Sequence, residues 1–302
     1  MWDDPKVVSA VIAAITSILT LLLTSLIKSV YERKFHIFKL EAEHRYEQRK
    51  KIKEILSSNK IHLINACESP NHRMWNFSSN HTEKWHCVDG EYTKKEHYYF
   101  HSFVYRVICV YAWIKKIENE MVYLDTTIAT KEDLELIKFL RVFPEILCDL
   151  FLVNGLEYDA NHQTDHLFTG TLDHMACSLL VNGNVCDFSS FQANLDKYIP
   201  NLEPLCKLIE CMSPDEERYR WDRFQILHYT IIAFLNAYGY DFQVTRDSKL
   251  KEIIFWRNQV ANNRLQETAN SAAAIASQRP AEGLVAFEGW LLRMFAAGGL
   301  RR

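Results

Sequence analysis

Two histidines four residues apart mark the stretch of the sequence that most resembles a metal site. On a helix, His162 and His166 would share one face, where two imidazole rings can bind one metal ion. Asp165 and His174 are the nearby candidates for further ligands. The glutamate that follows the first histidine in HEXXH metalloproteases is absent, because that position is Gln163. The cluster therefore leaves two alternatives, the site of a metal-dependent hydrolase and a solvated polar loop.

An arginine and a histidine at a fixed spacing form the second constellation. The segment from Arg223 to His228 resembles the RxxxxH element of the HEPN ribonuclease families. The resemblance implies RNA cleavage, with Arg223 neutralising charge on the phosphate and His228 transferring the proton. It covers six residues only, and the position after the arginine, commonly polar in those families, is Phe224. Packing is the alternative, because His228 also belongs to an apolar seam with three- and four-residue spacing: Trp221, Phe224, His228, Ile231, Leu235 and Tyr238.

A third group of potential ligands lies earlier in the chain: His72, His81, His86, Cys87, His97 and His101. No recognised zinc spacing matches it, because paired thiolates are absent. The sequence also contains no GxxxxGK[ST], GxGxxG or GxSxG motif, so nucleotide-dependent and serine-hydrolase chemistry have no support. No cofactor is firmly implied, and the cofactor stays unknown.

The composition indicates which elements must position these residues. The chain has 302 residues, of which 48% are hydrophobic and 24% charged, as in a globular protein. Only 9 Gly and 7 Pro favour long helices over a turn-rich β-sandwich or barrel. With 35 Lys+Arg against 38 Asp+Glu, the net charge of −3 makes nucleic acid an unexpected partner.

A long apolar run begins near the N-terminus. Residues 7–27 contain no ionisable side chain. At 1.5 Å per residue these 21 residues would form a helix about 31 Å long, which matches a hydrocarbon core of about 30 Å. A cleaved signal peptide is not expected, because residues 1–6 lack a basic region and the run exceeds a signal peptide's apolar region. We therefore expect one transmembrane helix over residues 7–27.

The charges that flank this run predict its orientation. One basic residue, Lys6, precedes it, whereas nine follow between Lys28 and Lys53. Basic residues next to a span stay on the cytoplasmic side. We therefore expect residues 1–6 to form a short extracytoplasmic N-terminus and the bulk of the chain to lie in the cytoplasm, at the plasma (inner) membrane. The bilayer is the first expected partner, since the basic stretch would also lie against anionic headgroups.

The eight cysteines agree with that orientation. They are scattered, form no CxxC pair, and several lie inside apolar runs. Such usage is typical of small buried residues in a reducing compartment. We therefore expect all eight thiols to be reduced.

Residues 28–60 are expected to continue as a charged juxtamembrane helix. No Pro or Gly interrupts them, and acids and bases alternate as i,i+4 pairs such as Glu41 and Arg45. A short apolar seam runs along this helix: Tyr31, Phe35, Phe38 and Ala42. The seam is too broken for a sustained coiled coil. A solvated stalk and a surface for a protein partner or for self-association are the two alternatives.

Residues 61–265 are expected to form a helical cytosolic domain. Helices are predicted at 96–120, 131–153, 202–211, 213–238 and 248–266, with a loop of short elements after Pro70 and a polar loop at 154–187. The clearest helix start is Ser213, followed by Pro214 and Glu216 in capping positions, and Gly239 is its predicted end.

The last residues, 266–302, differ in composition from the rest of the chain. They contain nine Ala and four Gly among 37 residues. No Lys follows Lys251. An Ala-rich helix and a weakly folded tail are the two alternatives for this segment.

The sequence as a whole predicts a mainly α protein with one N-terminal transmembrane helix, a long charged juxtamembrane helix and a helical cytosolic domain. The function that fits is a membrane-anchored module for interaction or sensing at the cytoplasmic face, without a defined reaction. The alternative is a membrane-tethered effector enzyme. It would act either as a ribonuclease through Arg223 and His228 or as a metal-dependent hydrolase through the His162 cluster.

Overall fold

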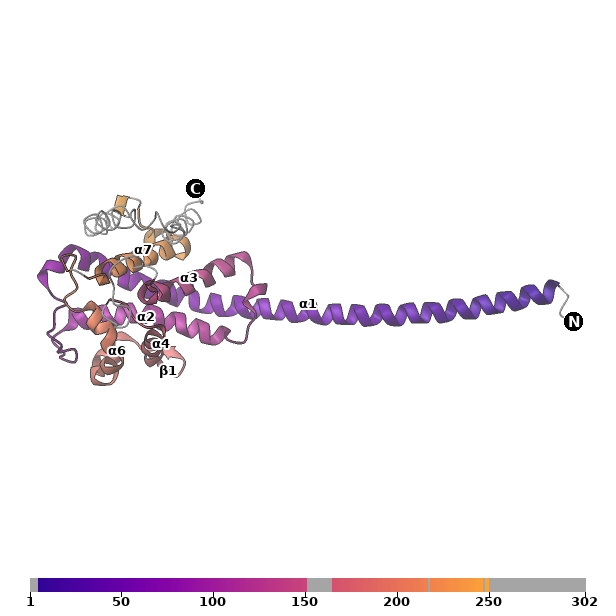
Figure 1. The fold of residues 1–302 in the computed structure, drawn as a ribbon, viewed down its shortest axis with the longest axis horizontal. Coiled ribbons are helices and arrows are strands. Elements are labelled where there is room, and N and C mark those ends of the chain that lie inside the picture. The colour runs from indigo at the N-terminus through magenta and orange to yellow at the C-terminus, as the bar shows by residue number, and fades with distance from the viewer. Residues whose placement is uncertain (1–4, 151–164, 217, 247, 250–302) are drawn as a thin grey trace, which may run out of the picture. The chain divides into compact units, whose positions relative to one another are not determined.

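The computed structural model describes residues 5–150, 165–216, 218–246 and 248–249. Over these residues the protein is mainly helical, as predicted (Figure 1). The helices are α1 (Pro5–Asn80), α2 (Tyr98–Met121), α3 (Lys131–Cys148), α4 (Thr169–Ser178), α5 (Phe188–Ala193), α6 (Leu195–Ile209) and α7 (Arg220–Tyr238). One antiparallel hairpin joins β1 (Leu180–Val181) to β2 (Asn184–Val185). His162, the helix predicted at 248–266 except its first two residues, and the segment 266–302 lie outside the described residues.

The chain divides into two compact units. The first unit comprises Met1–Lys53 and Leu124–Thr130, and the second comprises Glu54–Tyr123 and the residues from Lys131 on. Within the first unit, Arg49 Nε donates a hydrogen bond to the Ile128 carbonyl oxygen at 2.6 Å. The Asp125 carboxylate accepts from the Thr127 backbone N–H at 2.9 Å and so begins the short 3-10 turn Thr126–Ile128. The predicted helix at 28–60 is part of α1.

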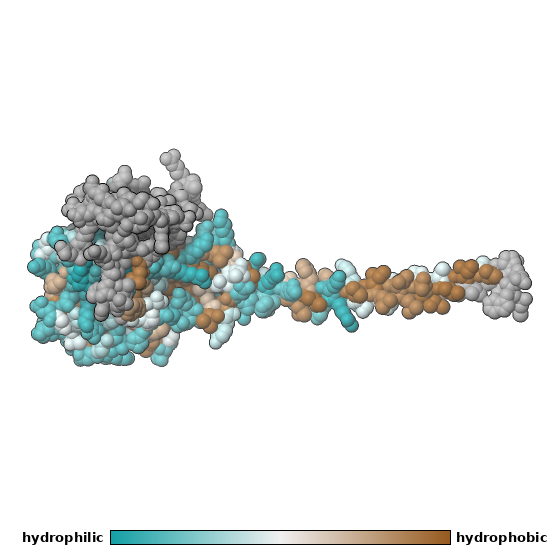
Figure 2. Space-filling view, in the orientation of Figure 1, coloured by the Kyte–Doolittle hydropathy of each residue, from teal (hydrophilic) through white to brown (hydrophobic). Residues whose placement is uncertain are grey.

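The apolar part of α1 is exposed. Among the described residues, α1 is the one helix long and apolar enough to cross a membrane, and none of its most apolar window is buried in the protein. Figure 2 shows apolar side chains along this stretch, followed by polar ones. Leu21 and Ile27, for example, are 71% and 68% exposed. A core helix of a soluble protein would bury such side chains.

The core of the second unit forms around α2. This helix packs against α4, α5 and β2, while α3 packs on α7 and α4 on α6. Phe103 of α2 is fully buried, with ring centroids 5.1 Å from Phe77 of α1 and 5.9 Å from Phe224 of α7. Three helices distant in sequence therefore meet at one aromatic cluster. The predicted helix at 96–120 corresponds closely to α2.

The predicted loop after Pro70 is wrong over its first part. Helix α1 continues through Pro70 to Asn80. A proline inside a helix removes one backbone hydrogen bond. Here the following turns bury Met74 and Phe77, and Arg106 Nη1 donates to the Ser69 carbonyl oxygen at 2.9 Å. Burial of two large side chains offsets the cost of the proline.

The predicted start of the last described helix is also wrong, although its end is right. Helix α7 begins at Arg220 rather than after Ser213. The Glu216 carboxylate, expected to close a capping box, accepts from the Ser213 backbone N–H at 3.4 Å and also binds the Arg220 guanidinium. At the other end a Cβ on Gly239 would lie 2.5 Å from the Leu235 carbonyl oxygen, so only glycine fits this close turn.

The predicted polar loop at 154–187 contains regular structure where it is described. It includes α4 and the β1–β2 hairpin. Asn182 and Gly183 form the hairpin turn with φ of 52° and 77°. Asn-Gly is the preferred pair for such a two-residue turn.

Candidate functional site

Arg223 is buried and bound to another helix. It is 1% exposed, and its Nη1 donates to the carbonyl oxygens of Ile146 and Asp149, both at 2.9 Å. Carbonyls at the end of a helix lack partners within the helix, and a cation there is favourable. Arg223 thus caps the end of α3.

His228 lies on the same helix but binds elsewhere. Its Nε2 is 3.0 Å from Asn71 Oδ1 of α1, and its ring meets Trp75 edge-on at 4.9 Å. An amide oxygen only accepts, so Nε2 is the donor. Burial lowers the pKa of His228 to about 3, so the ring is neutral near pH 7.

The described contacts of the Arg223–His228 segment give both residues packing roles. Arg223 binds α3, His228 binds α1, and neither lines the pocket described below. This agrees with the apolar seam identified in the sequence. A role of this pair in RNA cleavage stays a prediction.

The predicted metal ligands around His162 have separate partners where they are described. Asp165 is buried, and its carboxylate binds Arg218 Nε at 2.6 Å and the Tyr219 backbone N–H at 3.1 Å. His166 is buried edge-on to Phe168. His174 is exposed on α4, with Nε2 3.4 Å from Asn201 Oδ1.

No grouping of three His, Cys, Asp or Glu side chains that could hold a metal occurs in the described part of the chain. The earlier histidines, all of which are described, have other contacts. His86 Nε2 lies 2.9 Å from the Met212 carbonyl oxygen, and His101 Nε2 lies 2.8 Å from that of Tyr92. The remaining member with a thiol, Cys87, is bonded to another cysteine.

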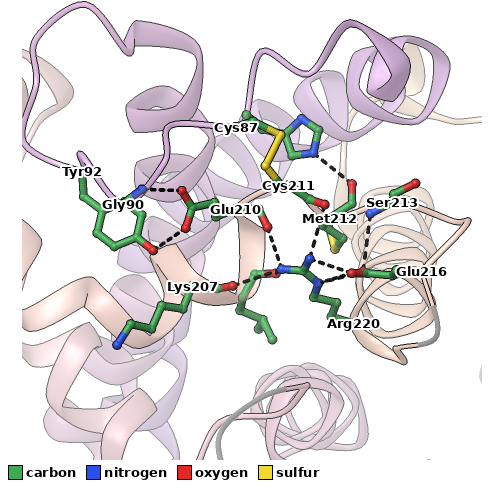
Figure 3. Close-up of a disulfide and its surroundings, with 12 residues drawn as sticks. Cys87, Gly90, Tyr92, Lys207, Glu210, Cys211, Met212, Ser213, Glu216 and Arg220 are labelled. Atoms are coloured by element: carbon green, nitrogen blue, oxygen red, sulfur yellow. Dashed lines mark hydrogen bonds and ion pairs between the residues drawn. A yellow bond between two sulfur atoms is a disulfide. The ribbon is translucent and has the colours of Figure 1, made fainter.

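Contrary to the expectation of eight reduced thiols, two of the cysteines are bonded to each other in this structure. Cys87 and Cys211 form a disulfide, with Cα atoms 4.6 Å apart (Figure 3). They are 124 residues apart in the sequence, so no spacing motif could reveal the pair. The other six cysteines are free. Burial raises the pKa of Cys109 to about 11 and raises that of Cys67, as expected for core thiols.

Two segments that are far apart in sequence meet at this disulfide. Cys87 belongs to the connection between α1 and α2, and Cys211 follows the end of α6 with φ of +50°. Glu210 ties the same segments together, because its carboxylate accepts from the Gly90 backbone N–H at 2.7 Å and from the Tyr92 hydroxyl at 2.6 Å. Burial, with this hydrogen bond, raises the pKa of Tyr92, which therefore stays a donor.

Arg220 organises the chain that leaves α6. Its side chain is 6% exposed and binds the Glu216 carboxylate at 2.6 Å. It also donates to four backbone carbonyl oxygens, at distances from 2.7 to 3.4 Å: those of Lys207, Leu208, Glu210 and Cys211. Figure 3 shows this guanidinium between the end of α6 and Glu216. No pattern in the sequence predicts this role, since it depends on a turn that the predicted helix start excluded.

A surface pocket of about 550 Å³ lies beside the disulfide. Its walls combine cationic and acidic side chains with one of the two bonded cysteines: Asp89, Gly90, Lys207, Glu210, Cys211, Arg218 and Arg220. Cys211 is exposed and Cys87 half-buried. A disulfide, charged side chains and access from solvent thus coincide here, which makes the pocket our candidate functional site. Comparisons with protein-family models, with curated proteins and with solved structures find no match to this chain.

Proposed function

We propose that the protein is a single-pass membrane protein whose helical domain acts in interaction or sensing at the cytoplasmic face. The observation that carries this proposal is the exposed apolar run of α1. From Ile12 to Ile27 every residue is exposed, although few side chains are polar. A bilayer is the environment in which such a helix would be stable.

The hydroxyl groups within the run support a lipid environment. Ser17 Oγ donates to the Ala13 carbonyl oxygen at 2.7 Å, and Thr20 Oγ1 donates to that of Thr16 at 2.7 Å. Thr24 donates to Thr20 in the same way. Hydroxyls that bond within their own helix need no water, which hydrocarbon cannot supply.

The proposed orientation places the N-terminus outside and the domain in the cytoplasm. It depends on the nine basic residues that follow the run, against one before it. Disulfides are typical of oxidising compartments, so the Cys87–Cys211 bond by itself favours the reverse orientation. We give the basic flank more weight, because charges next to a span set its orientation, whereas redox-sensing proteins in the cytosol form disulfides transiently.

Two experiments on the full chain in cells test this proposal. Alkaline carbonate washing should leave the protein in the membrane fraction; its release would reduce α1 to a peripheral helix. For the orientation, the exposed free thiol of Cys177 is the natural reporter. A membrane-impermeant maleimide should leave Cys177 unlabelled in intact cells and label a cysteine introduced by Asp3→Cys. The opposite pattern would place the domain outside the cytoplasm and overturn the orientation.

We also propose that the juxtamembrane part of α1 binds a second copy of the chain or another protein. Tyr31, Phe35 and Phe38 are 69%, 56% and 67% exposed, and the Tyr31 and Phe35 rings stack at 6.3 Å. Aromatic side chains on one helix face are suitable contacts for a partner helix.

Chemical cross-linking in membranes tests self-association. Wild type should give a cross-linked dimer that the double variant Phe35→Ser/Phe38→Ser loses. Leu40→Ser, at a 52% exposed position on the opposite face of the same helix, is the matched control and should keep the dimer. A wild type that stays monomeric would exclude self-association and leave a different protein as the partner of this surface.

A further inference from the structure

The contact between the α1–α2 connection and the end of α6 does not depend on the disulfide alone. Besides the two hydrogen bonds of Glu210, His86 Nε2 contacts the Met212 carbonyl oxygen at 2.9 Å, and the Cys211 N–H donates to the His86 carbonyl oxygen at 3.4 Å. These bonds flank the sulfurs on both sides (Figure 3). With the S–S bond broken, they would still hold the two thiols near each other. The S–S bond could therefore break and form again while the two segments stay folded.

The two sulfurs differ in accessibility. Cys211 is exposed and lines the pocket, whereas Cys87 is half-buried and is not among the lining residues. An attacking thiolate must approach a sulfur along the S–S axis with free access. Cys211 Sγ is consequently the atom that an external thiol would reach.

The charges around the pocket favour exchange. Three cations, Lys207, Arg218 and Arg220, line it against two carboxylates, Asp89 and Glu210, so the lining has an excess of one positive charge (3 − 2). Cations attract a thiolate nucleophile and stabilise a thiolate that leaves, and these are the environments in which reactive cysteines occur. The free cysteines of the core, by contrast, lie among apolar groups, and Cys67 and Cys206 are 0% exposed.

We propose that Cys87–Cys211 is a reversible thiol–disulfide exchange site, reduced by a dithiol protein or by a small thiol such as glutathione. The inference rests on the proposed cytoplasmic location of the domain, where such reductants are present. In this proposal the protein senses the thiol redox state of the cell. The response is the formation or loss of the covalent link between the α1–α2 connection and the segment after α6.

The exchange balances in two steps. The reductant thiolate attacks Cys211 Sγ, a mixed disulfide forms there, and the S–S electron pair leaves with Cys87 Sγ, which takes a proton from water. A second reductant thiolate then attacks the reductant's own sulfur in the mixed disulfide. Cys211 leaves as a thiolate and is protonated, so the protein gains two thiols and the reductant becomes a disulfide. A disulfide oxidant such as oxidised glutathione runs the steps in reverse.

The test measures the oxidation state of the two cysteines in the full-length, membrane-bound protein. Cells are quenched with acid, free thiols are alkylated, and the Cys87 and Cys211 peptides are quantified by mass spectrometry, with Cys177 as the reference free thiol. We expect mostly reduced Cys87 and Cys211 in untreated cells, at least about a tenfold rise in the disulfide fraction after diamide, and return to thiols after the oxidant is removed. A bond that is fully formed in untreated cells, or that never forms after diamide, would overturn the proposal.

Charge variants test the role of the pocket in vitro. Lys207→Glu should slow reduction by glutathione by at least about twofold at low ionic strength, because it repels the anionic nucleophile. Lys197→Glu makes the same charge change on α6 at an exposed residue outside the pocket, and should leave the rate unchanged. Equal rates in both variants would contradict the electrostatic part of the inference. The maleimide experiment separates the two proposals: a cytoplasmic Cys177 with a permanent disulfide defeats the exchange site alone.

Discussion

Replacing Arg220 should destabilise the second unit more than any change at the surface of α6. Its guanidinium is nearly buried, binds Glu216 and donates to four carbonyl oxygens that have lost their helical partners. Removing one partner of a buried pair leaves the other charge uncompensated, at a cost of about 3–5 kcal/mol. For Arg220→Ala we therefore expect a loss of about 3–5 kcal/mol.

Arg220→Lys should lose less stability than Arg220→Ala, because lysine keeps the positive charge. It does not keep the branched set of donors. A lysine ammonium is a single point of donation and cannot bind Glu216 and four carbonyls together. Each unmade hydrogen bond of a charged group costs about 1.5–3 kcal/mol. We therefore expect the stability of Arg220→Lys to lie between those of wild type and Arg220→Ala.

Thermal unfolding of the detergent-solubilised full chain measures both losses. Trp221, 2% exposed and adjacent to Arg220, should make tryptophan fluorescence sensitive to this region. At about 2–4 °C per kcal/mol for a domain of this size, Arg220→Ala should lower Tm by about 6–20 °C. Lys207→Ala is the control: its ion pair with Glu203 is 61% and 51% exposed, so its loss should change stability by less than about 0.5 kcal/mol. An Arg220→Ala protein within about 1 kcal/mol of wild type would refute the capping role.

Two further predictions concern the core. His228 has a pKa of about 3 in the folded chain and about 6.5 when unfolded, so the unfolded state binds a proton first as the pH falls. The free energy of unfolding should therefore decline below about pH 6.5, by at most about 1.4 kcal/mol per pH unit. The variant His228→Gln keeps a donor for Asn71 and should flatten this decline in urea titrations at pH 4–7. An unchanged slope would assign the decline to other groups, such as His86 and His101, whose pKa values burial also lowers. Phe103→Ala should lower the stability by about 3–5 kcal/mol, because it leaves a cavity at a fully buried ring. Tyr123→Ala, at a 93% exposed position, should leave Tm unchanged in the same melting assay. Similar Tm values for the two variants would contradict the assigned core.

The parts of the fold that sequence reasoning located correctly are those where local signals and packing agree. The apolar face at 96–120 became α2, and the stop at Gly239 holds because no larger residue fits there. The continuation of α1 past Pro70 is not predictable from the sequence, because a proline usually marks the end of a helix. Its buried face includes the polar residues Asn71 and Ser78, which interrupt the apolar period of Met74 and Phe77. Polar residues that are buried with a distant partner cannot be distinguished from exposed ones in one sequence.

The candidate site was missed for a related reason. Cys87, Glu210 and Arg220 acquire their roles from contacts between segments more than a hundred residues apart or from a turn that no local pattern specifies. Ser213-Pro214 is a strong helix-start signal, and Ser213 Oγ does accept from the Asp215 N–H at 3.2 Å, yet α7 begins only at Arg220, whose guanidinium Glu216 binds. His228 was the exception, since its position in an apolar seam correctly predicted a buried side chain.

The polar pairs between α1 and α7 have a consequence for how the chain folds during synthesis. His228 pairs with Asn71 across 157 residues, and Gln225 Nε2 donates to Ser78 Oγ across 147. At about 5–20 residues per second, the ribosome exposes the α1 face for roughly 8–30 s before α7 emerges to cover it. During that interval Phe77 lacks its ring contact with Trp221 of α7. The second unit should therefore acquire its protease resistance only once α7 has emerged, long after residues 7–27 have left the ribosome.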